Sequence, residues 1–386
     1  MNKRILILFV AALAILFFAG CAQEETNDDM ASAQVEETGD IVIGVAGAHS
    51  GDLASYGLPT VNAAQLVVDE VNAAGGINGR QVRLVIEDDQ CAPDVAINTA
   101  AKLVGDGVVA VIGHICSGAT NAAMEIYTGE NIVTISPSAT SPPLTQSGNF
   151  PTFFRTISPD DAQGALQAKF VAETLGLTSV AILHDGGDYG RGLAEFAQVA
   201  LQADYPQVNI ALFEGITVGA VDYSAIINRI GSAGVEGVIY GGYHPEASRL
   251  ITQMKAQGLD LAFVSGDGVK DKTFIDVAGA AADGVYATGP RDTSANTIAQ
   301  AARTAHQAKY SEEPGPFLME GYSAALALVN AIRVAGSTEP AAIMQALRSS
   351  QVDTPVGRIS FDQRGDATGV GFAMYRVQGG EYVELR

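Results

Sequence analysis

Short apolar runs rich in β-branched residues alternate along this chain with longer stretches of helical spacing. Residues 41–46 (IVIGVA) and 82–86 (VRLVI) flank segment 57–74, in which apolar residues recur every three or four positions. Further runs of the same kind occupy residues 108–112, 132–135, 180–183, 208–213, 235–240 and 262–264. Because these runs are solidly apolar, helices are expected to cover both faces of each strand. The alternation therefore predicts an α/β protein with parallel sheets.

A stretch rich in proline and glycine, residues 142–160, interrupts the alternation once. Strand and helix patterns lie on both sides of it, and a helix-rich stretch, residues 295–349, follows the second set. The last residues, 357–385, have the pattern of β strands, with a hairpin turn at Gly379-Gly380. A chain of 386 residues is long enough for two or three domains. Two sheets joined by crossing segments account for this organisation.

The first twenty residues have the composition of a secretory signal peptide. Lys3 and Arg4 precede an apolar run, residues 5–19, which as a helix would span roughly 22 Å, short of the ~30 Å of a membrane core. Residues 18–21 (FAGC) resemble a bacterial lipobox, although Phe18 stands where Leu is usual. The resemblance implies lipidation of Cys21 and a membrane anchor, with an ordinary secretory signal as the alternative.

Residues 21–39 contain several acidic side chains, no Lys or Arg and few large apolar side chains, which predicts a solvated tether. The whole chain has 22 basic and 43 acidic residues and a net charge of −21. Because nucleic acids are recognised first through their negative phosphates, this charge argues against a nucleic-acid partner.

Motifs for enzymatic chemistry are missing from the sequence. It contains no phosphate-binding loop of the form GxxxxGK[ST], no HExxH and no GxSxG, and the glycines of residues 187–192 lack dinucleotide spacing. Its five histidines have no Cys or His partner three or four residues away. We therefore expect no catalytic residue, no metal and no cofactor.

Cys91 and Cys116 each follow a predicted strand. Loops after neighbouring parallel strands meet at one edge of a sheet, and an exported chain folds in an oxidising compartment. These two cysteines are thus expected to form a disulfide that fixes the loop carrying Ser117, with two buried free thiols as the alternative.

Ligands of open α/β sheets bind beyond the carboxyl ends of the strands. In the first half of the chain these positions hold hydroxyl groups and helix starts, as in residues 116–120 and 136–140, which suit a carboxylate. In the second half they hold Tyr189, Tyr243 and Asp267, which suit an ammonium group. Each feature alone could be a helix cap, a packing aromatic or a turn residue. Together they predict a site for an amino-acid zwitterion between two lobes.

Three motifs carry a family resemblance: residues 75–79 (GGING), 113–117 (GHICS) and 240–246 (YGGYHPE). In these motifs the chain resembles the branched-chain amino acid substrate-binding proteins of bacterial ABC transporters, a type I periplasmic-binding family. The similarity extends from about Asp40 to the C-terminus.

The resemblance implies a two-lobed fold with three hinge crossovers. Each lobe would be a parallel sheet flanked by helices. Lobe 1 would comprise residues 40–158 and 290–368, and lobe 2 residues 159–289 and 369–386. The family disulfide falls on Cys91 and Cys116.

Site residues are implied as well. The ligand carboxylate would bind the side chains of Ser117 and Thr140 and the backbone near Ser138 and Ala139. Tyr189 and Tyr243 would line the opposite wall, and Asp267 stands where the family has a Glu that pairs with the ammonium group. Tyr56 and Phe317 would form the apolar pocket.

The function implied is that of an exported monomeric receptor that captures an amino acid by hinge closure and delivers it to an ABC permease. A receptor for an aliphatic amide, urea, another amino acid or a small aromatic acid is the first alternative. An exported hydrolase and a purely structural lipoprotein are the others.

Overall fold

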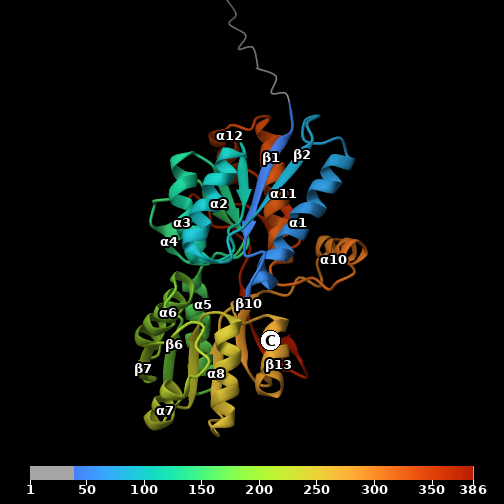
Figure 1. Cartoon of the computed structure of the whole chain (residues 1–386). Helices are drawn as coiled ribbons and strands as arrows, with labels where there is room; N and C mark the ends of the chain where they lie inside the picture. Colours follow the sequence, from blue (N-terminus) through green and yellow to red (C-terminus); the bar gives the residue numbers. More distant parts are fainter. Residues whose placement is uncertain (1–38, 386) are drawn as a thin grey trace, which may run out of the picture. The chain divides into compact units, whose positions relative to one another are not determined.

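The computed structural model describes residues 39–385 (Figure 1). The predictions for the signal peptide, residues 1–20, for lipidation of Cys21 and for the acidic tether up to residue 38 lie outside the described residues. In the part of the chain that is described, no helix has the length and apolar character needed to cross a membrane.

The first sheet has five parallel strands in the order β2-β1-β3-β4-β5. Their bounds are β1 Ile41–Gly47, β2 Val82–Asp88, β3 Ala110–Ile112, β4 Val133–Ser136 and β5 Phe153–Arg155. Helices cover both faces, as the solidly apolar strands predict. They are α1 Ala54–Ala73, α2 Pro93–Gly105, α3 Ser117–Gly129, α4 Pro143–Gln146, α10 Thr297–Tyr310, α11 Leu318–Ala335 and α12 Pro340–Ser349.

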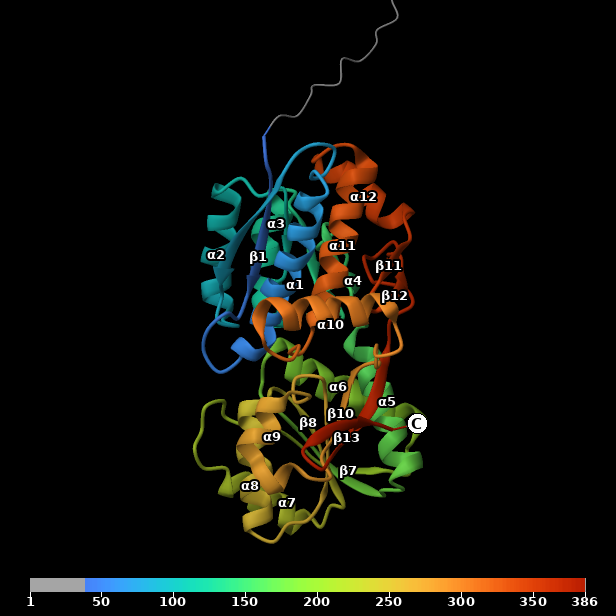
Figure 2. The same ribbon diagram turned by 90° about the vertical axis from the view of Figure 1, so that its right-hand side faces the viewer.

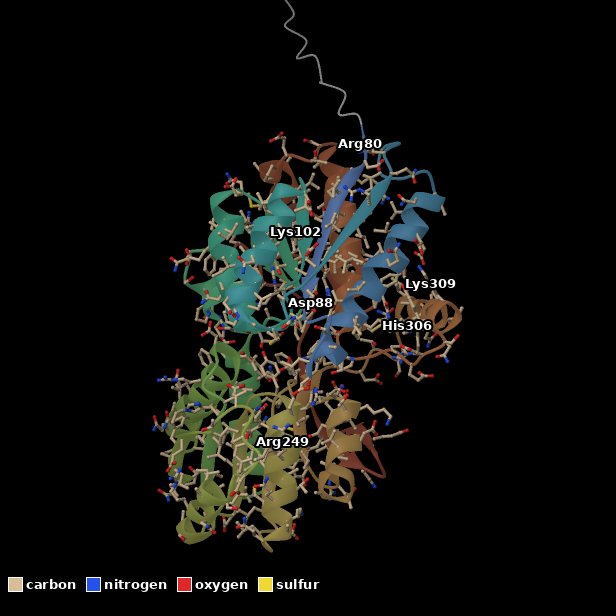
Figure 3. The ribbon with its side chains drawn as sticks, viewed as in Figure 1. Arg80, Asp88, Lys102, Arg249, His306 and Lys309 are labelled. Carbon is tan, nitrogen blue, oxygen red and sulfur yellow. A yellow bond between two sulfur atoms is a disulfide. The ribbon has the colours of Figure 1, made fainter. Side chains whose placement is uncertain are left out.

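Two apolar cores hold these layers together. Side chains of α1, α11 and α12 bury one face of the central strands, and Figure 2 shows these three helices on the same side of β1. Side chains of α2 and α3 bury the other face. Helix α10 is joined to α1 by the Lys309–Asp69 ion pair and by a 3.3 Å contact between His306 Nε2 and Asn62 Nδ2 (Figure 3).

The second sheet has seven strands in the order β14-β13-β10-β9-β8-β6-β7. Their bounds are β6 Ser179–His184, β7 Asn209–Gly215, β8 Gly237–Gly241, β9 Ala262–Ser265, β10 Tyr286–Pro290, β13 Phe372–Gln378 and β14 Glu381–Glu384. The helical segments of this part are α5 Asp160–Lys169, a π-helical turn at Phe170–Thr174, α6 Asp188–Asp204, α7 Ser224–Ala233, α8 His244–Ala256, α9 Lys272–Ala278 and a 3-10 turn at Gly279–Ala282.

Helices α5 and α6 pack on one face of this sheet, and α7, α8 and α9 pack on the other. The α/β prediction is confirmed, and so is the hairpin at Gly379-Gly380 between β13 and β14. The expectation of purely parallel sheets is wrong at one end, because β13 is antiparallel to both β10 and β14. Full burial of every strand is also wrong, since the edge strands β2 and β7 are only partly covered.

The chain passes between the sheets three times. It leaves the first sheet after β5, returns after β10 to form α10 and α11, and re-enters the second sheet at β13. A hairpin of β11 Val352–Thr354 and β12 Gly357–Ile359 precedes the third passage. The predicted limits of lobes 1 and 2 stay a prediction.

Buried Arg155 links the first and third passages. Its Nε donates to Asp366 Oδ1 at 2.6 Å, and its Nη1 donates to the carbonyl oxygens of Ala139 and Ser141. Its Nη2 donates to the Thr145 hydroxyl. One guanidinium group therefore holds the loop after β4 against the segment that leads back to the second sheet.

Close packing between β8 and α6 gives a test of the second sheet. A Cβ atom on Gly241 would lie 1.9 Å from the carbonyl oxygen of Gly190, so Gly241→Ala requires the backbone to move. We expect this overpacking to lower the free energy of unfolding by about 1–3 kcal/mol in urea denaturation. The matched control is Gly192→Ala in α6, where the added Cβ meets nothing within 4 Å. This substitution should raise the free energy of unfolding by up to about 1 kcal/mol. Equal stability of the two variants would contradict the packing described.

Candidate functional site

A small cavity lies where the carboxyl ends of both sheets meet. Seven of the nine predicted ligand residues line it, and Ile115 and Gly268 complete the lining. The seven are Tyr56, Ser117, Ser138, Tyr189, Tyr243, Asp267 and Phe317. The structure thus brings together side chains that are up to 261 positions apart in sequence, between Tyr56 and Phe317.

Ala139 and Thr140 do not line the cavity, although both were predicted to be near the ligand. Both are fully buried. The Ala139 carbonyl accepts a hydrogen bond from Arg155, and the Thr140 carbonyl accepts one from the Asp160 amide at 3.0 Å. These two residues therefore support the wall.

The hydroxyl wall comes from the first sheet. Ser117 is the first residue of α3, and its Oγ accepts a hydrogen bond from the Ser141 amide at 3.2 Å. The Ser138 hydroxyl donates to the Ile115 carbonyl at 2.7 Å. Because the first amides of a helix have no partner inside the helix, the start of α3 offers N–H donors to an anion.

Covalent and polar contacts hold this wall in place. The predicted disulfide is confirmed: Cys91 and Cys116 are bonded, and Cys116 directly precedes α3. The buried His114 side chain contacts Asp89 Oδ2 through Nδ1 at 2.5 Å and the Tyr127 hydroxyl through Nε2 at 3.0 Å. The loop from His114 to Ser117 is consequently fixed at both ends.

The opposite wall centres on Asp267, whose side chain is almost completely buried. Its Oδ1 accepts hydrogen bonds from the Tyr189 hydroxyl at 2.7 Å and from Gln163 Nε2 at 3.0 Å. The Tyr189 hydroxyl in turn accepts from the Gly268 amide at 2.9 Å. Within residues 39–385, Asp267 forms no ion pair with Lys, Arg or His.

Burial shifts the pKa values of the titratable side chains in this wall. It raises the pKa of the Asp267 carboxyl above its usual range, since a charged carboxylate loses its hydration there. Burial and the neighbouring carboxylate raise the pKa of Tyr189 well above its ordinary value, so its hydroxyl stays a donor. An ammonium group in the cavity would supply the positive charge that Asp267 lacks.

Aromatic rings form the rest of the cavity lining. The Tyr56 ring lies 5.7 Å from the Phe317 ring and 6.3 Å from the Tyr243 ring, centroid to centroid. The Tyr243 and Tyr189 rings are 5.1 Å apart. These faces offer an apolar surface beside the polar groups.

Direct contacts close the two walls over the cavity. The Tyr56 hydroxyl donates to the Gly268 carbonyl at 2.8 Å. On another side Asn121 Nδ2 donates to Asp188 Oδ2 at 3.1 Å, and the Ser55 hydroxyl donates to Asp271. The structure therefore shows the closed arrangement of this site.

Comparison with known proteins agrees with this geometry. The profile of a family described as periplasmic binding protein matches residues 40–381, nearly all of the described chain. The chain belongs to the periplasmic binding protein family. This membership confirms the resemblance seen in the three sequence motifs and the expectation of a binding protein rather than an enzyme.

Curated relatives are more than a third identical to this periplasmic binding protein over the aligned residues. The leucine-, isoleucine-, valine-, threonine- and alanine-binding protein of Pseudomonas aeruginosa is 38% identical over 335 residues, covering 87% of this chain and 89% of that protein. The Leu/Ile/Val-binding protein of Escherichia coli K12 is 36% identical over 336 residues, covering 87% and 90%.

Solved structures share the fold. A leucine binding protein from Thermotoga maritima superposes with a TM-score of 0.82 at 25% identity, covering 90% of this chain and 98% of that one. A branched-chain amino acid transporter substrate binding protein from Streptococcus pneumoniae, in complex with isoleucine, gives 0.79 at 29% identity, covering 90% and 100%.

Sequence reasoning missed Ile115, Gly268, Gln163 and Asp160. The first two adjoin predicted residues, so proximity along the loop was the available signal. Gln163 and Asp160 lie at the start of α5, and no strand-end pattern points to them.

The disulfide gives a test of how the hydroxyl wall is held. Replacing both Cys91 and Cys116 with Ser reopens a loop closed over a sequence separation of 25, and we expect the free energy of unfolding to fall by about 3 kcal/mol. Denaturant titration measures this, and the wild type under reducing conditions is the matched comparison. An unchanged transition midpoint would show that the bond does not stabilise this loop.

Proposed function

We propose that this protein is a receptor that captures a branched-chain amino acid and delivers it to an ABC permease. The observation that carries the proposal is a buried carboxylate, Asp267, that faces a wall of hydroxyl groups and a helix start across one closed cavity. The Pseudomonas and Escherichia relatives, whose names state leucine, isoleucine and valine, support the choice of ligand class.

An amino-acid zwitterion matches the two polar walls in charge. Its carboxylate binds Ser117 and the N–H groups at the start of α3, with the Ser138 segment beside it. Its ammonium group binds Asp267, whose Oδ1 is already oriented by Tyr189 and Gln163. Ala139 and Thr140 act from behind the wall by fixing the loop that carries Ser138.

The aliphatic side chain of the ligand packs on the aromatic lining. Tyr56, Tyr243 and Phe317 supply this surface, and burial of apolar area contributes roughly 25 cal/mol per Å². The Tyr56 hydroxyl is occupied by the Gly268 carbonyl, so its ring and not its oxygen faces the ligand.

Capture proceeds by closure of two lobes about three connecting segments. Lobe 1 comprises residues 40–158 and 290–368, and lobe 2 comprises residues 159–289 and 369–386. The ligand binds first to one wall of the open form, and closure then brings the other wall into contact and expels water. Removal of water strengthens each charged hydrogen bond in the site.

Export and anchoring complete the proposal. The signal peptide, residues 1–20, directs export, and lipidation at Cys21 tethers the monomeric receptor to the membrane through an acidic linker. The closed form then presents both lobes to the permease.

Calorimetric titration of residues 22–386 with the common amino acids tests the function. We expect micromolar or tighter binding of leucine, isoleucine or valine. Asp267→Asn should weaken that binding by about 10–100-fold, because a hydrogen bond to a charged group contributes about 1.5–3 kcal/mol.

The control for charge is Asp283→Asn, an exposed carboxylate on the turn before β10, which should leave affinity unchanged. If the protein binds urea, an aliphatic amide or an aromatic acid and binds no amino acid, the proposed ligand class is wrong. Retention of full leucine affinity in Asp267→Asn would show that the ligand's ammonium group does not bind Asp267.

A further inference from the structure

A second buried carboxylate lies directly behind Asp267. Asp160, the first residue of α5, is completely buried. Gln163 Nε2 donates to Asp160 Oδ1 at 2.8 Å and to Asp267 Oδ1 at 3.0 Å. A single side-chain amide group therefore bridges two carboxylates.

The side-chain amide of Gln163 cannot be flipped, with its oxygen and nitrogen exchanged, without losing hydrogen bonds. Gln163 Oε1 accepts hydrogen bonds from the Thr288 hydroxyl and, at 3.3 Å, from the Asp267 amide. This assignment points the NH₂ group at both acids. The Asp160 Oδ2 atom faces the Thr140 hydroxyl, but neither atom has a hydrogen bond of normal geometry within residues 39–385.

Neither acid forms an ion pair with a Lys or Arg side chain in the described part of the chain, although the nearby charge of Arg155 lowers the pKa of Asp160 and Lys270 interacts electrostatically with Asp267. The guanidinium group of Arg155, on β5, directs its hydrogen bonds to Asp366, to two carbonyl groups and to Thr145. The ammonium group of Lys270 lies over the Tyr375 ring, 4.2 Å from its centroid, and forms no ion pair with Asp267. Two negative charges in such a site repel each other and lack hydration, which favours retention of one proton.

We propose that Asp160 and Asp267 share one proton in the empty site, and that an ammonium ligand displaces this proton to solvent when it binds. The inference rests on the proposed function and deepens it. The ligand enters with its ammonium group intact and one proton leaves to the buffer, so the positive charge of the ammonium group takes the place of the positive charge of the proton beside the two acids. Asp160 is thus a positioning residue that makes the site selective for a charged amine.

Burial supports this arrangement. It raises the pKa of Asp160 well above its usual range, with the charge of Asp267 as the second cause, and it raises the pKa of Asp267 too. An ammonium ligand lowers both pKa values. Affinity gained from the ionised pair is therefore present at higher pH and is lost as pH falls through the pKa of the empty pair.

Other titratable groups face the pair from neighbouring elements. Burial holds the tyrosines neutral, because it raises the pKa of Tyr56, Tyr189 and Tyr243 well above the ordinary value. Burial also raises the pKa of Glu320, on α11, to about 7. A Glu320 variant is therefore needed to separate its proton exchange from that of Asp160 and Asp267. The remaining charged neighbours are Arg155 on β5, Asp161 on α5, Lys270 after β9 and Asp271 before α9.

The test is calorimetry with L-leucine at about pH 7 in two buffers of different ionisation enthalpy, repeated from about pH 5.5 to about pH 8. The wild type should release about one proton per leucine, and its association constant should rise up to about tenfold per pH unit on the acid side. Asp160→Asn should still bind leucine while losing both the proton release and the pH slope. A carboxylic acid of the same shape that lacks the amine, 4-methylpentanoate, should cause no release.

Two controls separate this pair from its surroundings. Asp161→Asn, at the exposed neighbouring position on α5, and Glu320→Gln should both keep the proton release of the wild type. Leucine binding by the wild type without proton exchange would overturn this inference alone, even if Asp160→Asn does not fold. Release that is lost in Glu320→Gln and kept in Asp160→Asn would overturn it as well. Absence of leucine binding would overturn the proposed function, and this inference with it.

Discussion

Burial of the Asp267 carboxylate without an ion pair to a Lys, Arg or His in the described residues is the constraint that gives the cavity its chemical character. Water is excluded from this group by Tyr189 on α6, by Gln163 on α5 and by the contact between Tyr56 and Gly268. A carboxylate in this setting is costly unless positive charge or a proton reaches it. A ligand that carries an ammonium group meets that need, and a neutral ligand does not.

The fold places complementary chemistry opposite this charge. Parallel strands bring their carboxyl ends to one edge of each sheet, and the helix that follows each strand begins there with free amide groups. Between the sheets, Arg155 connects the loop after β4 with Asp366 near the third passage of the chain. The loop that supports the hydroxyl wall is thereby tied to the segment that leads into the third passage.

Much of this architecture could be predicted because the signals are local. Solid apolar runs predicted two-sided burial, and cysteines after two strands predicted the disulfide that the structure contains. The two strands, β2 and β3, were expected to be neighbours, but β1 lies between them. Residues 369–386 were assigned to lobe 2, but the antiparallel pairing of β13 with β10 was not predicted, because the two strands lie far apart in sequence. Strand-end reasoning located the cavity walls but could not tell that Ala139 and Thr140 lie behind the surface. It also could not find Asp160 and Gln163, since their role comes from a helix packing against a loop about a hundred positions away.

The orientation of the bound ligand is the most direct test of this account, and a crystal structure of the leucine complex measures it. The account predicts the ligand nitrogen within hydrogen-bond distance of Asp267, and the ligand carboxylate on Ser117 and the start of α3. The isobutyl group should lie against Tyr56 and Phe317. A ligand bound in the reverse direction, or bound outside this cavity, would contradict it.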